Sequence, residues 1–433
     1  MKSMKKDISL YNVLNRILAE LNEQVVEHGE RVAYMYLKLA QYRGLPDDQK
    51  MENMMLACYA HDIGAYKTEK FLNLLNFDVS GTSEHCIYGC LFMKHFSPIG
   101  QDAEVLLYHH TAYADVNFDD CPMAEDGVLI HLLDRIDVLG LLRDREGIME
   151  RIQSLSGINF NPGDVKDFAL ADLEYDIIEH LKDGSFRDEV RSYFDREERI
   201  ERLIDPVIAM LAYEVDFKSE QTVVHSITTT LFADVLADRL GLGTKERKAL
   251  RYAARVHDLG KIDVPQEIVE KPGRLTPDEY AEMKNHVLYT EKIIEGILPE
   301  QVVRIASRHH ERLDGSGYPL GLTAEELGLE DRIMQVSDVI SALLQKRSYK
   351  EIMGREQVLN ILGEEAESGR LDPEIIRIFA VDYDEIVKTV WNLSSGTIGM
   401  YENLQREYKI YLDRYSEFMN IEKEEFGLFT GII

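Results

Sequence analysis

One stretch of the chain decides its interpretation: His309-His310-Glu311-Arg312-Leu313-Asp314-Gly315-Ser316-Gly317-Tyr318-Pro319. Upstream of it lie His225, the pair His257-Asp258 and His286, and downstream lies Asp338. These seven histidine and aspartate residues offer five imidazoles and two carboxylates, enough for two divalent metal ions if helices bring them together. The set therefore predicts a metal-dependent hydrolytic site.

The spacing of these residues favours convergence on a helical scaffold. The gaps are 32, 29 and 23 residues from His225 through His257 and His286 to His309, and 28 from His310 to Asp338. Each gap is long enough for one helix, a connecting loop and a second helix that runs back to the same site. Adjacent residues of a helix point about 100° apart, so a His-Asp pair can face two metals. A single histidine on an apolar face is more often a core residue. That interpretation would have to explain every member of the set at once, so we favour the metal site.

Three motifs follow one another along the chain: His257-Asp258-Leu259-Gly260-Lys261, His309-His310-Glu311 and Gly315-Ser316-Gly317-Tyr318-Pro319. In this order they resemble the HD-GYP phosphodiesterases, and the likeness covers roughly residues 216 to 385. The resemblance implies an all-helical HD-superfamily domain that hydrolyses cyclic dinucleotides, chiefly cyclic di-GMP to the linear dinucleotide pGpG, which further hydrolysis would take to GMP. It also implies two divalent metal ions, iron or manganese.

The resemblance implies roles for individual residues. It places one metal on His225, His257, Asp258 and Asp338, and the other on Asp258, His286, His309 and His310, with Asp258 as the shared catalytic carboxylate. Lys261 is expected to stabilise charge on the phosphate, and Tyr318 to contact the ligand. Arg347 and Lys350, spaced i and i+3 on one helical face, are expected to bind phosphate.

Three positions depart from the family pattern: Gln221 where members with a third metal carry Glu, Thr290 where Gly is usual, and Ser341 where Asp is common. The first favours a two-metal site. A missing carboxylate behind a ligand weakens metal binding or activity by about 10–100-fold. A sensor that binds a cyclic dinucleotide with weak activity is therefore an alternative, as is a phosphodiesterase for cyclic GMP-AMP. A nucleotidase or phosphatase of broader scope is disfavoured by the intact Gly-Tyr-Pro loop.

The first half of the chain repeats the ligand order with His28, His61, Asp62, His85, His109, His110 and Asp134. A repeat of this length indicates a domain duplication. The first copy has Ala65 in place of Lys261 and lacks the Gly-Tyr-Pro loop, although it keeps Gly89 and Asp137. We therefore expect a metal-binding HD domain of diverged or lost activity.

The expected fold class is all-α, with tandem HD-superfamily helical domains. The expected ranges are 1–165 for the diverged HD domain, 166–215 for a helical connector, 216–385 for the HD-GYP domain and 386–433 for a C-terminal helical extension. The apolar stripe of the extension fits packing within the chain or the seam of a homodimer.

Charge and composition limit the classes of partner and the cellular location that we expect. A net charge of −29 argues against long nucleic acid or an anionic membrane surface. No apolar run approaches the ~18 residues of a membrane span, and the start lacks a signal-peptide core, so we expect a cytoplasmic protein. The four cysteines (Cys58, Cys86, Cys90 and Cys121) are expected to be reduced thiols. His85-Cys86 with Cys90 lacks a Cys-x-x-Cys knuckle, so the sequence does not favour a separate zinc site.

Overall fold

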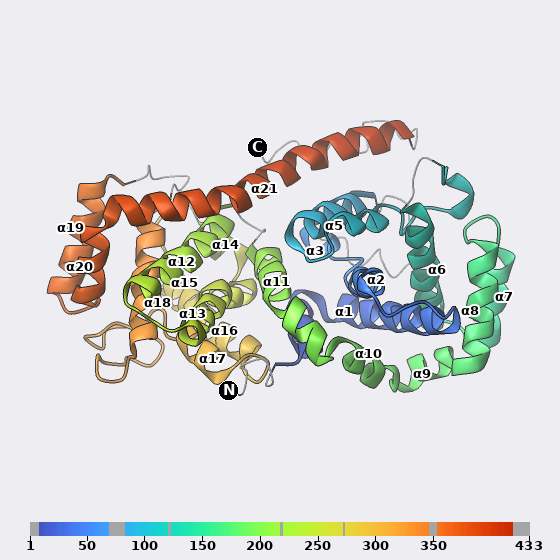
Figure 1. Ribbon diagram of the computed structural model, residues 1–433, viewed down its shortest axis with the longest axis horizontal. Coiled ribbons are helices and arrows are strands. Elements are labelled where there is room, and N and C mark those ends of the chain that lie inside the picture. The colour runs from blue at the N-terminus through green and yellow to red at the C-terminus, as the bar shows by residue number, and fades with distance from the viewer. Residues whose placement is uncertain are drawn as a thin grey trace. The chain divides into compact units, whose positions relative to one another are not determined.

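The computed structural model describes residues 8–68, 83–119, 123–216, 220–271, 273–345 and 353–418. These residues form helices joined by turns and contain no strand, only two isolated bridges, which confirms the expected all-α class (Figure 1). None of the helices in these ranges is both long and apolar enough to cross a membrane.

The chain divides into two compact units. One comprises residues 1–21 and 195–399, and the other residues 22–194 and 400–433. We call them the C-terminal unit and the N-terminal unit after the main part of each. Helices α1 (Leu10–Tyr42) and α21 (Tyr383–Phe418) contribute to both. Non-helical backbone at Asn22 kinks α1 where the first unit ends and the second begins.

In the C-terminal unit, α12 packs against both α13 and α18, and α17 packs against α13. The short helix η4 lies against α16, so the turn after α13 is held close to the start of α16. The helices of this unit beyond α1 and α21 are α11 (Glu197–Asp216), α12 (Glu220–Arg239), α13 (Thr244–Val256), η4 (Leu259–Asp263), α14 (Gln266–Val269), α15 (Pro277–Lys284), α16 (His286–Ile294), α17 (Glu300–Ala306), α18 (Leu329–Leu344), α19 (Arg355–Glu367) and α20 (Pro373–Val381).

In the N-terminal unit the helices that carry the predicted ligands follow one another in an order similar to that of the C-terminal unit. Here η2 packs against α2, α5 and α6. Its helices are the later part of α1 and then α2 (Gln49–Tyr59), α3 (Ala65–Thr68), α5 (Ser83–Phe96), η2 (Gly100–Leu107), η3 (Tyr113–Asp115), α6 (Ala124–Gly140), α7 (Arg145–Ser154), α8 (Pro162–Tyr175), α9 (Ile177–Asp183) and α10 (Phe186–Phe194). The parallel order agrees with a duplication, while the assignment of this unit as an HD domain stays a prediction.

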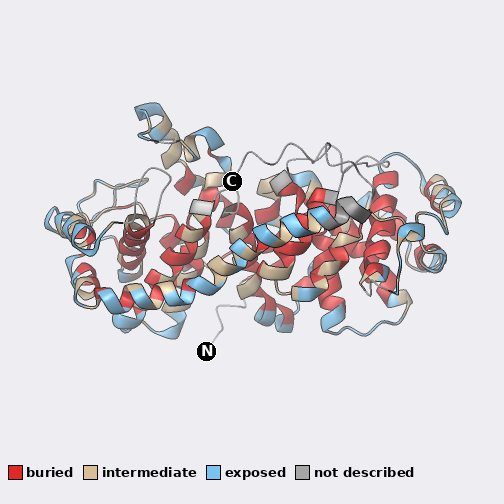
Figure 2. Cartoon of the chain, turned by 90° about the horizontal axis from the view of Figure 1, so that it is seen from above, coloured by how far each residue is buried: buried red, intermediate tan, exposed pale blue. Residues whose placement is uncertain are grey.

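Each half of the chain contains an Asx-Pro pair, Asn161-Pro162 in the first and Asp372-Pro373 in the second, and in both pairs the Asx residue is a helix N-cap. Asn161 accepts a hydrogen bond from the Gly163 amide before α8, and Asp372 accepts one from the Glu374 amide before α20. Such caps satisfy amides that have no partner within the helix. Phe168 and Phe379, seven residues beyond each cap, are fully buried. Figure 2 shows the buried residues lining the inner faces of the helices.

The compact units differ from the expected domain ranges. Residues 8–21 belong with the C-terminal unit, where Asp195 accepts hydrogen bonds from Ser9 Oγ and the Tyr11 amide at 2.6 and 3.1 Å. Residues 166–194, the first part of the expected connector, belong with the N-terminal unit, where Phe186 and Phe194 are buried. Helical periodicity shows that a segment has an apolar stripe but not which core receives it.

Candidate metal centre of the C-terminal unit

The seven predicted ligands of the C-terminal unit lie together. They come from α12, the turn after α13, the first residue of α16, the turn after α17, and α18: His225, His257, Asp258, His286, His309, His310 and Asp338. Asp258 lies in the middle, with Oδ2 3.2 Å from His257 Nε2 and Oδ1 3.5 Å from His286 Nε2. Asp338 Oδ1 lies 3.0 Å from His225 Nε2. The His286 and His309 Nε2 atoms are 3.2 Å apart.

The histidine rings are held in the tautomer that a metal requires. The Nδ1 atoms of His257, His286 and His309 each lie 2.6–2.8 Å from the carbonyl oxygen three residues earlier. A carbonyl oxygen only accepts, so each Nδ1 donates its proton to the main chain and Nε2 is the nitrogen left for a metal. The Nε2 atoms of His257 and His286 face Asp258. Among the described residues, His257 Nε2 is buried with no hydrogen-bond partner. Such a polar atom is costly to bury unless something binds it.

The electrostatics suit cations. Burial alone would raise the pKa of Asp258, but His257 and Lys261 hold it well below its usual range. Asp338 is held ionised in the same way by His225. Burial and neighbouring histidines lower the pKa of His309 well below its usual value, so its ring stays neutral. Ionised carboxylates and neutral imidazoles are the forms that bind divalent metals, so the residues present fit such ions.

Backbone contact fixes the spacing of two ligand segments. A Cβ on Gly260 would lie 2.0 Å from the His286 carbonyl oxygen, so only glycine allows this approach. Thr290 stabilises the same contact, because its hydroxyl accepts from the Gly260 amide and donates to the His257 carbonyl, both at 2.9 Å. Thr290, a departure from the family pattern, thus joins the two segments by hydrogen bonds.

The Gly-Tyr-Pro loop lies against the centre. The Tyr318 ring packs on the His310 ring, with centroids 4.8 Å apart and a 33° angle between the planes. Glu311 is fully buried, and its carboxylate accepts the Leu320 and Leu322 amides at 2.7 and 2.8 Å. Sequence reasoning gave Glu311 no role, yet it fixes the loop that carries Tyr318.

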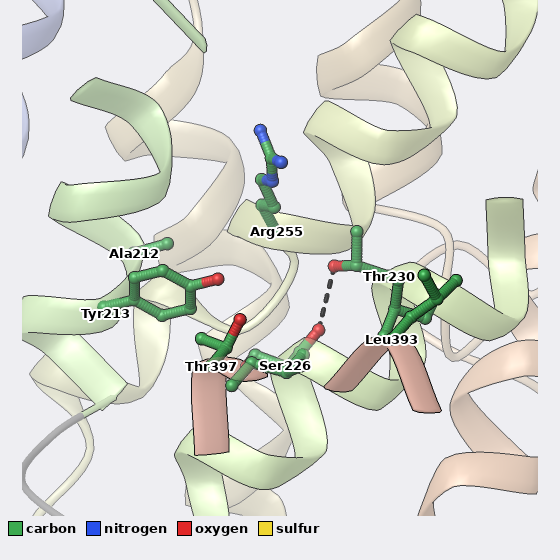
Figure 3. Close-up of a pocket in the computed structure, with 9 residues that line it drawn as sticks. Ala212, Tyr213, Ser226, Thr230, Arg255, Leu393 and Thr397 are labelled. Atoms are coloured by element: carbon green, nitrogen blue, oxygen red, sulfur yellow. Dashed lines mark hydrogen bonds between the residues drawn. The ribbon is translucent and has the colours of Figure 1, made fainter. Parts of the chain in front are cut away.

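Of the residues predicted to contact phosphate, the structure places Lys261 alone. Lys261 Nζ lies 2.6 Å from Asp258 Oδ2. Arg347 and Lys350 lie outside the described residues, and so does the side chain of Gln221. A separate cavity of about 160 Å³ is lined by Ser226, Thr230, Arg255 and neighbouring residues, and by none of the predicted site residues (Figure 3).

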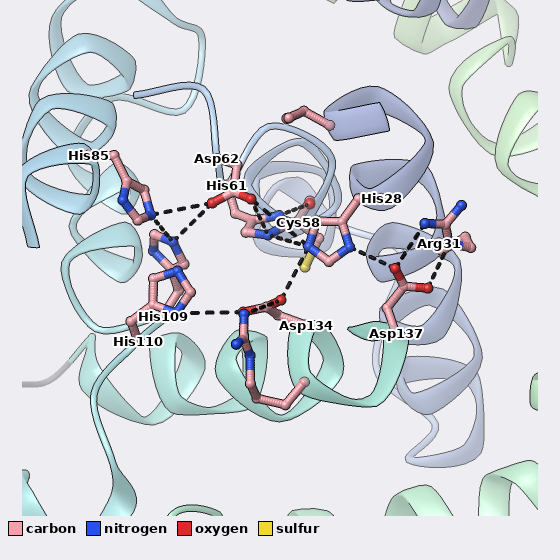
Figure 4. A network of polar contacts seen from close by, with 12 residues as sticks. His28, Arg31, Cys58, His61, Asp62, His85, His109, His110, Asp134 and Asp137 are labelled. Atoms are coloured by element: carbon pink, nitrogen blue, oxygen red, sulfur yellow. Dashed lines mark hydrogen bonds and ion pairs between the residues drawn. The ribbon is translucent and has the colours of Figure 1, made fainter. Parts of the chain in front are cut away.

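The seven corresponding residues of the N-terminal unit also converge (Figure 4). Asp62 Oδ1 lies 3.4 Å from both His85 Nε2 and His109 Nε2, and His28 Nε2 lies 3.1 Å from His61 Nε2. His110 Nδ1 lies 3.6 Å from Asp134 Oδ2.

One side of this second cluster is occupied by a network of ion pairs. The Arg135 guanidinium binds both oxygens of Asp134 at 2.7–3.1 Å, and Arg31 binds Asp137. Burial disfavours the His28 cation, but hydrogen bonds to Asp134 and Asp137 outweigh it and raise its pKa to about 10. Arg135 was not anticipated from the sequence; it replaces Val339 of the C-terminal unit and contacts the ligand candidate Asp134.

The two clusters differ in access to solvent. The side chains of His225, Asp338 and His310 are 11%, 11% and 23% exposed. The corresponding side chains of His28, Asp134 and His110 are 2%, 1% and 7% exposed. Catalytic metal sites keep an open position for substrate, whereas structural sites are closed. By this measure the C-terminal cluster is the more accessible of the two.

A helical bundle with this order of histidines and aspartates defines an HD-superfamily phosphohydrolase, a class that depends on metal ions. The family model described as HD domain matches residues 206–375. The chain is 30% identical over 388 residues to the 3′3′-cGAMP-specific phosphodiesterase 1 of Vibrio cholerae, covering 84% of this chain and 88% of the relative. It is 38% identical over 173 residues to the cyclic di-GMP phosphodiesterase response regulator of Xanthomonas campestris, covering 39% of this chain and 45% of the relative.

The chain belongs to the HD-domain cyclic dinucleotide phosphodiesterases of the HD-GYP type, and it is therefore a phosphodiesterase. This confirms the family expected from the three motifs. The family model matches the C-terminal half alone, so an HD domain in the N-terminal half stays a prediction.

Proposed function

We propose that the C-terminal centre opens one phosphodiester of cyclic di-GMP and releases the linear dinucleotide pGpG. The observation that carries this proposal is the cluster of seven ligand candidates next to Tyr318 and Lys261, in which the side chains of His225, Asp338 and His310 are partly exposed. The N-terminal cluster is proposed to bind metal without turnover, because it is closed and lacks an equivalent of Lys261.

Two divalent ions, iron or manganese, would be held by His225, His257, Asp258 and Asp338 on one side and by Asp258, His286, His309 and His310 on the other. When bound, such a pair of ions lowers the pKa of a coordinated water and neutralises charge on the phosphate.

The remaining chemistry belongs to side chains of the chain itself. Lys261 Nζ is 2.6 Å from Asp258, and its side chain is 25% exposed, so the ammonium can reach a phosphate beside that carboxylate. A fixed cation there stabilises the charge that develops during displacement. Tyr318 offers an aromatic face on which a base can stack, a contact worth about 1–3 kcal/mol. Arg347 and Lys350 are proposed to bind the second phosphate.

The cyclic dinucleotide 3′3′-cGAMP is a second candidate substrate. One observation favours it: a relative named for that substrate matches both halves of this chain, covering 84% of it. The cyclic di-GMP phosphodiesterase of Xanthomonas campestris matches 39% of this chain. The two substrates differ in one base, so discrimination would depend on contacts to the base edges.

The test is turnover of both cyclic dinucleotides by protein purified without oxygen and loaded with iron or manganese. Metal content is counted, and products are separated by chromatography. Comparable metal loading with a higher kcat/KM on one dinucleotide identifies the substrate. A fully loaded protein that binds a dinucleotide without opening it would instead support the sensor alternative.

A further inference from the structure

Cys86 lies in the N-terminal cluster. It follows His85 in the first turn of α5 and is 2% exposed. Its Sγ lies 3.7 Å from His85 Nε2 and 3.8 Å from His109 Nε2. These three atoms and a ring nitrogen of His110 are all within 4.8 Å of one another. In the C-terminal unit the corresponding residue is Val287, which offers no ligand atom.

The separations match the edges of a tetrahedral metal site. Bonds of about 2.0–2.1 Å to nitrogen and about 2.3 Å to sulfur give edges of about 3.3–3.4 Å between nitrogens and about 3.5–3.6 Å between sulfur and nitrogen. The His85 and His109 Nε2 atoms are 3.2 Å apart, and Asp62 Oδ1 is 3.4 Å from each. With the Cys86 distances, five of the six edges lie within a few tenths of an ångström of these values.

An unsatisfied atom of this set indicates independently that a ligand is needed there. Among the described residues, Asp62 Oδ1 is buried and has no hydrogen-bond partner, and the same holds for Nε2 of the nearby His110, which is not one of the four proposed ligands. His109 donates from Nδ1 to the Leu106 carbonyl at 2.7 Å, and its Nε2 lies 3.4 Å from Asp62 Oδ1. A cation would satisfy the carboxylate and the imidazoles together.

We propose that His85, Cys86, His109 and Asp62 hold one zinc ion in a closed, structural site. A thiolate ligand selects zinc over manganese or magnesium, whereas the histidine and carboxylate set of the C-terminal centre does not. The opposite side of the N-terminal cluster, where Arg135 binds Asp134, is held by ion pairs and holds no second ion. The two halves of the chain thus bind different metals.

The test uses the full-length protein, stripped of metal and reconstituted with cobalt, which reports a thiolate ligand as a near-ultraviolet charge-transfer band. We expect the band in the wild type and its loss in Cys86→Ala. It should persist in Cys90→Ala, a matched control because Cys90 lies four residues further along α5 and is equally buried. Cys121→Ala controls for the cysteine outside the described residues.

Zinc-edge X-ray absorption of the wild-type protein tests the same ligand set and does not depend on whether a variant folds. We expect a sulfur scatterer at about 2.3 Å from zinc. Nitrogen and oxygen scatterers alone, or a cobalt–thiolate band that survives in Cys86→Ala, would overturn the proposal.

Discussion

Ser341 Oγ lies 3.1 Å from His225 Nδ1. In the N-terminal unit the equivalent nitrogen, His28 Nδ1, is bound by Asp137. The residue that contacts Asp137 or Ser341 also differs between the two units. Arg31 binds Asp137 in the N-terminal unit, while Thr228, at the position of Arg31, lies 2.7 Å from Ser341 through its hydroxyl. A hydroxyl pair thus replaces an ion pair, and His225 stays oriented without a carboxylate.

Ser341→Ala should weaken metal binding by about 10–100-fold, because it removes the group that orients His225. Thr228→Arg combined with Ser341→Asp should restore binding, whereas Ser341→Asp alone buries a carboxylate that lacks its guanidinium. Metal titration checks this, with Ser337→Ala as control: Ser337 is equally buried and bonds only a main-chain carbonyl in the described structure. Equal affinity of Ser341→Ala and wild type would contradict the role.

His257→Ala should lose metal and abolish detectable turnover, because a ligand is removed from the catalytic cluster. Metal counting and product chromatography on the same preparation check both effects. His95→Ala, which alters a histidine outside both clusters, is the control. Unchanged metal content with unchanged rate would place the site elsewhere.

The equivalent aspartates of the two clusters should behave differently. Asp258→Ala should abolish turnover. Asp62→Ala should lose metal and lower Tm while keeping kcat within about threefold, because Asp62 belongs to the closed cluster. Calorimetry and steady-state kinetics on the two full-length variants make the comparison. A large loss of kcat in Asp62→Ala at a temperature where it is folded would show that the N-terminal cluster takes part in catalysis.

Lys261→Ala should lower kcat by about 10²–10³-fold and leave metal content intact, because its charge acts on the reacting phosphate. The measurement is kcat at saturating substrate together with a metal count. Lys271→Ala is a matched control, since Lys271 pairs with Glu279 away from the ligands. Loss of metal from Lys261→Ala would assign the lysine to holding Asp258 instead.

Arg347→Ala combined with Lys350→Ala should raise KM by at least about tenfold with full metal content, since charged donors to phosphate supply affinity in an acidic protein. Steady-state kinetics check this, with Arg377→Ala plus Lys388→Ala as a control for net charge. Wild-type KM in the first double variant would move the substrate pocket elsewhere.

The sequence was sufficient for the all-α class, the family and the convergence of both ligand sets. A ligand set has fixed spacings and few residue types, so Asp258 and its partners can be recognised from the order of residues alone. The metal ions themselves, and the roles of these residues, stay predictions.

Other features depend on which side chains meet. Arg135 adjoins Asp134 in sequence, but only the structure shows its guanidinium on that carboxylate. Cys86 lies about one helical turn from Cys90 and has no Cys-x-x-Cys partner, so the sequence does not favour a zinc site there, yet its sulfur lies beside His109, which comes from another element. The extent of each compact unit also depends on such contacts, since Asp195 binds Ser9 and the Tyr11 amide near the start of the chain.

The glycine after each His-Asp pair has a consequence for how such a site changes over time. Gly64 approaches the His85 carbonyl as closely as Gly260 approaches that of His286, with a virtual Cβ at 2.1 and 2.0 Å. The distance between two ligand segments is therefore set by main chain against main chain. Side chains around this contact differ between the two halves, as Ala65 and Lys261 do, while the close approach of the two main-chain segments is the same in both.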